Sequence, residues 1–190
     1  MALPASATAP VETAYAAAPV VASTTVSVKT LAAPKVAYAP FTTKLTAYNA
    51  VPSQTDSNPF TTASGAFSNP EVVAARSGDL AYKLPYGTVI KIERELADTP
   101  NCNYSLVESQ VGYRVIADAM NTRIVNTVDI LLDQNKTVPY QGRQINPGRA
   151  LGICGSATIT VVGKIDVKDI PSTQAELAAM VEGNTVLAIR

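Results

Sequence analysis

Residues 41–166 of this chain form a series of short segments in which apolar and polar residues alternate or β-branched residues dominate. Segments of this length, separated by proline, glycine and asparagine, are typical of β-strands. The strands that we expect cover residues 41–50, 71–75, 88–93, 112–118, 126–133 and 157–165, and the stretch 135–155 is predicted to be irregular. With so little helical periodicity, the sequence predicts a mainly β domain, a six- to seven-stranded β-barrel over residues 41–166.

The carboxyl end carries a separate helix signal. Thr173 followed by Glu176 is a capping-box pattern, and Gly183 is placed to end the helix. Three apolar residues fall on one face of this helix: Leu177, Met180 and Val181. Residues 184–190 have the composition of one more strand. Residues 167–190 are therefore predicted to form an appendage, a short helix and a strand, that packs on the barrel.

Residues 1–40 differ from the rest of the chain, with thirteen alanines, five prolines and only three charged residues. Proline at this density interrupts helices, so we expect a flexible Ala/Pro/Thr-rich linker or arm. The weak alternation of residues 21–31 is also compatible with an edge strand added to a neighbouring envelope protein. Residues 2–10 look like the small-residue end of a secretory signal. We expect an exported protein of the periplasm or cell surface, its signal peptide absent or already removed.

Charge and composition exclude several classes of function. The chain has 15 basic and 15 acidic residues, so no net positive charge favours nucleic acid as a partner. No apolar run approaches the roughly 18 residues that a transmembrane helix needs. The sequence contains no histidine, which removes histidine-based triads and most zinc sites. Acid and base chemistry therefore falls mainly to carboxyl groups.

The two cysteines, Cys102 and Cys154, are too far apart in the sequence for a metal-binding motif. They form either one disulfide bond or two buried thiols. The disulfide is expected if the protein is exported, and the buried thiols are expected if it stays in the cytosol.

Asp118 and Asp129 each follow an apolar run and lie eleven positions apart. If their strands are neighbours, acids at the ends of both strands meet at the rim of the barrel and face a groove. Two close, partly desolvated carboxyl groups raise the pKa of one of them, as acid catalysis of glycoside cleavage requires. The structural alternative makes Asp118 a turn residue and pairs Asp129 with Arg114 or Arg123.

Several blocks of the sequence, taken in order, carry a family resemblance: LTAYNA, TTASG, VVAA, LPYGTVIKI, YRVIADAMNTR, VDILLD and TITVVGKI. Over residues 43–165 they resemble the 3D domain, which is named for three aspartates. That domain is related to the double-psi β-barrel of MltA-type lytic transglycosylases and is similar in layout to RlpA-like proteins. The resemblance implies a double-psi β-barrel with a groove that binds a glycan strand of peptidoglycan.

The resemblance also implies roles for three aspartates. Asp129 matches the catalytic acid/base, which protonates the glycosidic oxygen and then takes the proton of the muramic acid 6-hydroxyl as a 1,6-anhydro ring closes. Asp118 matches an aspartate close to it, and Asp79 is the nearest match to the first aspartate of the family. No metal or organic cofactor is required for this reaction.

Further polar residues in or beside the matching blocks are candidates for binding the substrate: Tyr48, Thr62, Ser64, Asp79, Asn121 and Arg123. Hydroxyl and amide groups of this kind bind sugar hydroxyls and acetamido groups, and the ring of Tyr48 is suited to stack on a sugar. The alternative for Thr62 and Ser64 is that TTASG is simply a turn.

Three functions remain open at this point. The first is an exported enzyme that cleaves peptidoglycan strands as lytic transglycosylases do. The second is a non-catalytic envelope module that binds glycan or a protein within a larger surface assembly, and the third is a secreted or phage-borne lysin. A groove near Asp129 that residues 134–153 fill would favour the structural role, and an open groove would favour the catalytic one.

Overall fold

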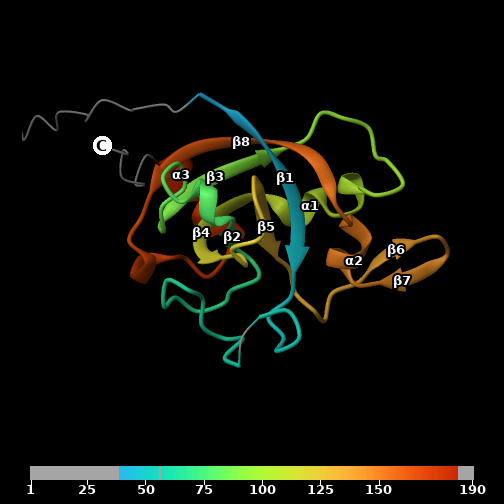
Figure 1. Ribbon diagram of the computed structural model, residues 1–190, viewed down its shortest axis with the longest axis horizontal. Helices are drawn as coiled ribbons and strands as arrows, with labels where there is room; N and C mark the ends of the chain where they lie inside the picture. The colour runs from blue at the N-terminus through green and yellow to red at the C-terminus, as the bar shows by residue number, and fades with distance from the viewer. Residues whose placement is uncertain (1–38, 56, 184–190) are drawn as a thin grey trace, which may run out of the picture. The chain divides into compact units, whose positions relative to one another are not determined.

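Six strands form a closed barrel in the computed structural model, which describes residues 39–55 and 57–183 (Figure 1). Around the barrel the order is β1 (Phe41–Tyr48), β5 (Thr127–Leu131), β2 (Val73–Arg76), β4 (Tyr113–Ala119), β3 (Thr88–Glu93) and β8 (Cys154–Lys164). The predicted mainly β fold, with a six-stranded barrel and a short carboxyl-terminal helix, is confirmed. Apart from residues 39 and 40, the predicted arm lies outside the described residues, as does the predicted strand over 184–190.

The barrel combines parallel and antiparallel pairs. β1 pairs with β5 and β2 pairs with β4 in parallel, and the other four neighbouring pairs are antiparallel. Parallel partners require crossover connections, because a tight hairpin joins only antiparallel strands. This arrangement is compatible with the double-psi connectivity that the resemblance implies.

Two layers of apolar side chains lie on the two faces of the barrel wall. The inner layer takes residues from all six strands, among them Leu45, Ala74, Ile90, Ile116, Ile130 and Ile159. The outer layer covers one side of the wall with Val73, Val89, Val115 and Leu131, and Leu177 packs against it. Because successive side chains of a strand point to opposite faces, both layers arise from the same strands.

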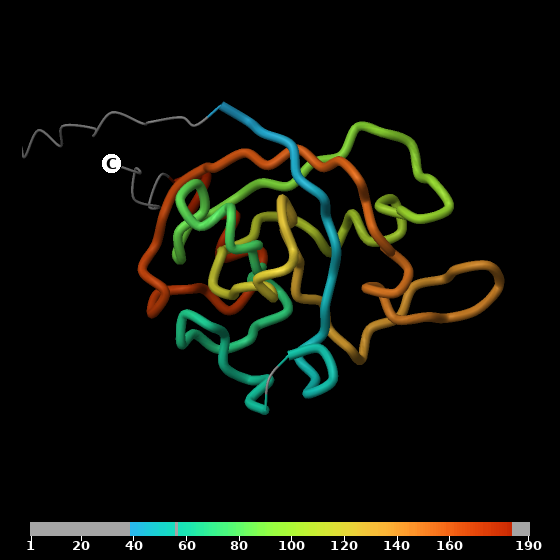
Figure 2. The backbone as a smooth tube through the Cα atoms, viewed as in Figure 1, coloured from blue at the N-terminus to red at the C-terminus, as the bar shows by residue number. Residues whose placement is uncertain are grey.

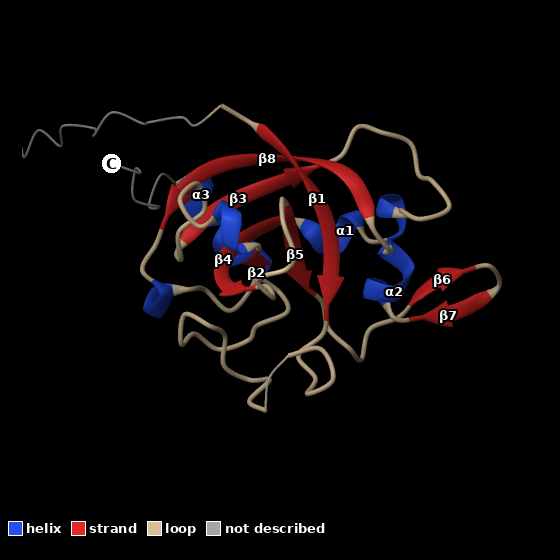
Figure 3. Ribbon diagram, viewed as in Figure 1, coloured by secondary structure: helices blue, strands red, loops and turns tan. Residues whose placement is uncertain are grey.

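The helices are short (Figure 3). They are α1 (Glu108–Val111), α2 (Pro147–Leu151) and α3 (Gln174–Glu182), with three shorter 3-10 turns, η1 (Gly78–Leu80), η2 (Tyr104–Leu106) and η3 (Val167–Asp169). The capping box of α3 forms as predicted, since Thr173 accepts from the backbone of Glu176 and Glu176 accepts from the backbone of Thr173. Gly183 ends the helix.

The prediction that residues 135–155 are irregular was wrong. They contain a hairpin of β6 (Val138–Tyr140) and β7 (Arg143–Ile145), followed by α2, and the hairpin projects away from the barrel (Figure 2). Gln141 and Gly142 both have positive φ, 48° and 76°, as the tight turn of a hairpin requires. Asn146 then caps α2 by accepting from the backbone N–H groups of residues 148 and 149.

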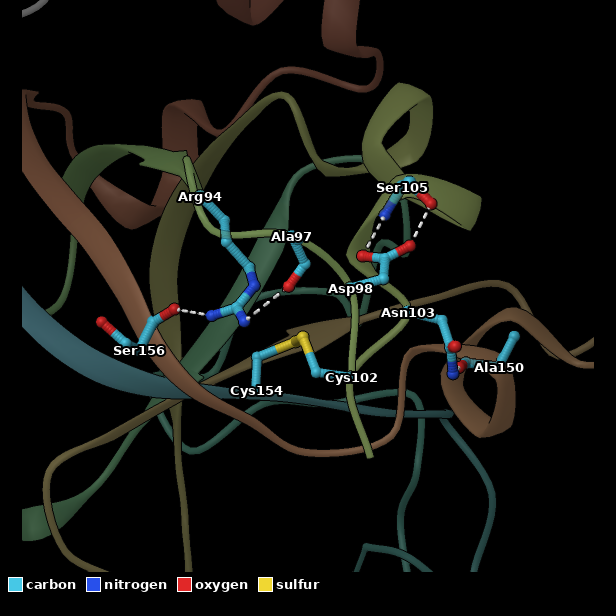
Figure 4. The surroundings of a disulfide bond; sticks show 9 residues. All are labelled: Arg94, Ala97, Asp98, Cys102, Asn103, Ser105, Ala150, Cys154 and Ser156. Carbon is cyan, nitrogen blue, oxygen red and sulfur yellow. Dashed lines mark hydrogen bonds between the residues drawn. A yellow bond between two sulfur atoms is a disulfide. The ribbon is translucent and has the colours of Figure 1, made fainter. Parts of the chain in front are cut away.

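A disulfide bond joins Cys102 to Cys154, and both residues are buried (Figure 4). It fastens the long β3–β4 connection to the beginning of β8. The surrounding hydrogen bonds join Asn103 to Ala150, Asp98 to Ser105, and Arg94 to Ala97 and Ser156. The connection is therefore held at several points beside the disulfide.

Replacing both cysteines by serine is expected to lower the free energy of unfolding by about 2–4 kcal/mol. The bond closes a loop with a sequence separation of 52, which restricts the unfolded chain strongly. Urea unfolding of the oxidised wild type and of the double variant measures the difference. Wild type treated with a reductant serves as the control and should match the variant, whereas equal midpoints for all three samples would contradict the expectation.

Candidate active site

Four side chains occupy matched positions on four adjacent strands. Thr46 on β1 is in register with Asp129 on β5, Asp129 with Ala75 on β2, and Ala75 with Asp118 on β4. Side chains at matched positions point to the same face of a sheet. The two acids are thus separated by two strand spacings, about 10 Å between Cα atoms, with only the methyl group of Ala75 between them.

A β-bulge brings Asp118 onto this face. Ile116 pairs with Ala74, but the next partner of β2, Ala75, pairs with Asp118, so Ala117 is an extra residue in β4. Simple alternation would leave Asp118 on the face of Ile116, which belongs to the barrel interior. The bulge therefore turns the Asp118 carboxylate outward, to the face that carries Asp129.

Asp129 is a partly buried acid in the middle of β5. The prediction that both acids end their strands was therefore wrong for Asp129, which faces outward between the buried Val128 and Ile130. Burial is the main cause that raises the pKa of Asp129 to about 6, and the negative charge of Asp118 adds to it. The Thr46 hydroxyl, which donates to Asp129 Oδ1 at 2.6 Å, opposes this rise.

Asp118 is held by three hydrogen-bond donors. The backbone N–H groups of Ala63 and Ala119 both donate to Oδ1 at 2.9 Å, and the Tyr48 hydroxyl donates to Oδ2 at 2.8 Å. Tyr48 is buried, and its burial, together with the charge of Asp118, raises the pKa of its phenol far above the ordinary value. The phenol therefore remains a donor at every pH at which the protein would work.

The two acids lie on one wall of a cavity of about 530 Å³. This volume is within the range of about 300–1,000 Å³ that is common for sites of small ligands. The barrel contributes Tyr48, Ala75, Asp118, Ala119 and Asp129; the β1–β2 loop (residues 49–72) contributes Gln54, Thr55, Pro59, Thr61, Ala63 and Ser68; the β4–β5 connection contributes Met120, Asn121 and Ile124. The cavity thus combines two acids with neutral polar and apolar groups.

Two features of the cavity lining bear on its use. Within the described part of the chain, no lysine or arginine lines it, so the acids face no cation there. None of its lining residues comes from residues 134–153, the segment that would have filled the groove in a purely structural role. Residues 134–153 therefore do not fill the groove beside Asp129.

The structure places the other predicted binding residues differently. Asn121 lines the cavity, but its Oδ1 accepts from the backbone N–H and Nε of Arg123, which does not line it. The hydroxyls of Thr62 and Ser64 bond to each other at 3.1 Å, and Thr62 also bonds to the carbonyl of Ala66. Thr62 and Ser64 therefore stabilise the turn of their own loop.

Asp79 lies apart from the other two aspartates. It is exposed in η1 and accepts from the backbone N–H of Asn126, at 3.0 and 3.2 Å. Hydrogen bonds, chiefly from the Ser77 side chain, hold the pKa of Asp79 below its usual range. Asp79 thus fastens the turn before β5 and does not line the cavity.

The expected ion pair of Asp129 does not form with Arg114 or Arg123 in the described residues. Arg114 is buried and donates only to backbone carbonyls. The partner of Asp129 is Thr46, which sequence reasoning missed. The signal was present in LTAY, where Thr46 and Tyr48 share the alternating face of one strand.

Ala75 and the loop residues Gln54, Thr55 and Thr61 were also missed as parts of the site. Ala75 carries no chemical group that marks it, and its importance comes only from its position between two acids. Gln54 and Thr55 belong to a polar stretch with no distinctive motif. In the TTASG block Thr62 and Ser64 were predicted to bind the substrate, whereas Thr61 is the threonine that lines the cavity. Only the pairing of strands distant in the sequence brings these residues together.

No protein-family model matches the chain, and no curated protein is similar to it. In the described ranges, no helix is both long and apolar enough to cross a membrane. Among those same residues, no group of three acidic or cysteine side chains is arranged to bind a metal ion. The paired acids and their cavity are therefore the features of the molecule that indicate a function.

Proposed function

We propose that the cavity binds a glycan strand of peptidoglycan and that Asp129 is the acid that cleaves it, as in lytic transglycosylases. The observation that carries the proposal is Asp129 itself, a partly buried carboxyl group on a cavity wall with a pKa raised to about 6. A general acid must hold its proton near the working pH, and an ordinary aspartate does not. With a pKa of about 6, the Asp129 carboxyl group carries its proton most of the time in a mildly acidic cell envelope.

The reaction needs one group that first gives a proton and then takes one. Asp129 donates its proton to the glycosidic oxygen, the bond from that oxygen to C1 of muramic acid breaks, and the leaving sugar departs with a new hydroxyl. The Asp129 carboxylate then takes the proton of the 6-hydroxyl while O6 bonds to C1. The product has a 1,6-anhydro ring, no water is consumed, and Asp129 regains its proton.

Asp118 supports this route over hydrolysis. Hydrolysis by two carboxyl groups needs a second carboxylate that takes a proton from water. Asp118 already accepts three hydrogen bonds, which leaves it little capacity to do so. In the proposed role the negative charge of Asp118 favours the protonated form of Asp129 and stabilises positive charge that develops at C1.

Two further features support the proposed substrate and the proposed location of the protein. The resemblance to the 3D domain suggests the same substrate class, and a closed six-stranded barrel is compatible with that family's double-psi fold. The disulfide between Cys102 and Cys154 favours an oxidising compartment, in agreement with export to the periplasm or cell surface. Peptidoglycan is accessible in that location.

The position of Asp79 favours a second candidate function. The resemblance implies three aspartates, and only two of them line the cavity. A barrel that lacks one of the three is also suited to bind a glycan strand without cleaving it, as part of a larger surface assembly. In that case the cavity is a binding site, and Asp129 donates a hydrogen bond to the sugar.

Digestion of purified peptidoglycan, with the products identified by mass spectrometry, separates these possibilities. Products with 1,6-anhydro ends are the expected result. Products with reducing ends would show hydrolysis and contradict the role given to Asp118. Binding of the protein to peptidoglycan without any soluble product would instead support the non-catalytic module.

A further inference from the structure

A second, smaller cavity lies beside the candidate active site. Its volume is about 170 Å³, and its lining includes Phe67 and Asn69 from the β1–β2 loop and Lys168, Ile170 and Pro171 from the segment before α3. Phe67 forms a β-bridge with Thr61, which lines the main cavity. Since bridged residues lie about 5 Å apart, residues that line the two cavities are direct neighbours in this loop.

Phe67 is an exposed aromatic side chain on a well-fastened loop. The side chain is 67% exposed, although the backbone beside it is fixed by bonds from Thr62 to Ala66 and from Asn69 to Phe67, both at 2.9 Å. Of the three phenylalanines in the chain, Phe41 packs on the barrel core, and Phe60 and Phe67 are exposed in this loop. The loop therefore presents two exposed aromatic rings, and Phe67 is the one that lines the second cavity.

The chemistry of the second cavity suits a sugar ring. A pyranose presents C–H groups on one face, which stack on the negative face of an aromatic ring, and hydroxyls on its edge. Phe67 and Pro171 supply apolar surface, and the side chains of Lys168 and Ser172 supply polar groups. The Asn69 side chain holds the two segments together, because it donates to the Ser172 carbonyl and accepts from the Glu71 N–H. The main cavity also combines apolar and polar groups, so one amphipathic polymer fits both.

We propose that the second cavity is an additional sugar subsite, in which Phe67 stacks on a ring of the same glycan strand whose neighbouring part occupies the main cavity. This inference rests on the proposed function and adds a preference for strand length. A disaccharide fills the main cavity alone, whereas a longer strand crosses the Thr61–Phe67 pair and gains the stacking contact. The protein therefore prefers long strands to short fragments.

Binding of size-fractionated glycan strands from peptidoglycan tests the subsite. The protein carries Asp129→Asn throughout, so that no substrate is consumed, and calorimetry measures the affinity for a disaccharide fraction and a long-strand fraction. Adding Phe67→Ala is expected to weaken long-strand binding about tenfold, as the loss of an aromatic contact does, and to leave disaccharide binding unchanged. Adding Phe67→Tyr, which keeps the ring, should preserve both affinities.

Tyr82→Ala is the matched control, since Tyr82 is 94% exposed and lines neither cavity. Equal long-strand affinity with and without Phe67→Ala would overturn the subsite and leave the proposed function standing. An equal loss for both fractions would also overturn it, because Phe67 would then act on the main cavity. If the protein with Asp129→Asn alone binds neither fraction, both the proposed function and the subsite are overturned.

Discussion

Replacing Asp129 by asparagine is expected to reduce glycan-strand cleavage about a thousandfold, because the variant has no proton to give to the glycosidic oxygen. The substitution keeps the shape of the side chain, and the Thr46 hydroxyl that donates to Asp129 Oδ1 can donate to the amide oxygen instead. The fold should therefore remain intact. The release of soluble fragments from labelled peptidoglycan measures the rate.

Asp133→Asn provides the matched control for this variant. Asp133 lies just beyond β5, outside the cavity lining, and accepts the backbone N–H of Asn135. Asp133→Asn should change the cleavage rate less than twofold. The circular dichroism spectra of the wild type and of both variants should be the same. An Asp129→Asn protein that retains most of the wild-type rate would show that another group supplies the proton.

Replacing Arg114 by methionine is expected to lower the free energy of unfolding by about 3–5 kcal/mol. Arg114 is fully buried in β4, and burial lowers the pKa of its guanidinium to about 10, so the group remains charged at neutral pH. It forms no ion pair within the described residues. Its hydrogen bonds go to five backbone carbonyls, those of Pro70, Val73, Gln110, Val111 and Leu131.

Those five carbonyls belong to four segments that are distant in the sequence: the β1–β2 loop, β2, α1 and β5. Methionine fills much of the same volume but donates no hydrogen bond, so the buried carbonyls lose their partner. Urea unfolding measures the loss. Arg149→Met, at an exposed position, should change stability by less than about 0.5 kcal/mol, and a similarly small change for Arg114→Met would contradict the structural role.

The parts of the fold that could be predicted depend on residues close together in the sequence. Alternation and β-branched residues identify β3 and β8, and the capping box identifies α3, because these signals lie within a single element. The β6–β7 hairpin escaped prediction because its turn is Gln141–Gly142, and a glutamine with positive φ is uncommon. Arg114 was considered as an ion-pair partner of Asp129, because its charge gives no sign that it bonds to a set of buried carbonyls.

In the candidate site, too, only the features that depend on residues close together in the sequence could be predicted. That Asp118 and Asp129 form a pair could be predicted from the apolar runs and the resemblance. Their geometry could not, because it depends on the bulge at Ala117 and on the register of β2 between β4 and β5. Register is a property of strands far apart in the chain, and local alternation alone would direct Asp118 into the barrel. Asp79 had a suitable sequence position, but the structure uses it to fasten a turn.

The most direct test of Asp129 as the acid is a titration of its carboxyl group in the folded protein, with the carboxyl ¹³C chemical shift as the readout. We predict a pKa of about 6 in the wild type. In Asp118→Asn the pKa of Asp129 should fall, because the neighbouring negative charge that favours the protonated form is lost. An Asp129 that titrates near 4, the ordinary value for aspartate, in both proteins would contradict its role as the acid.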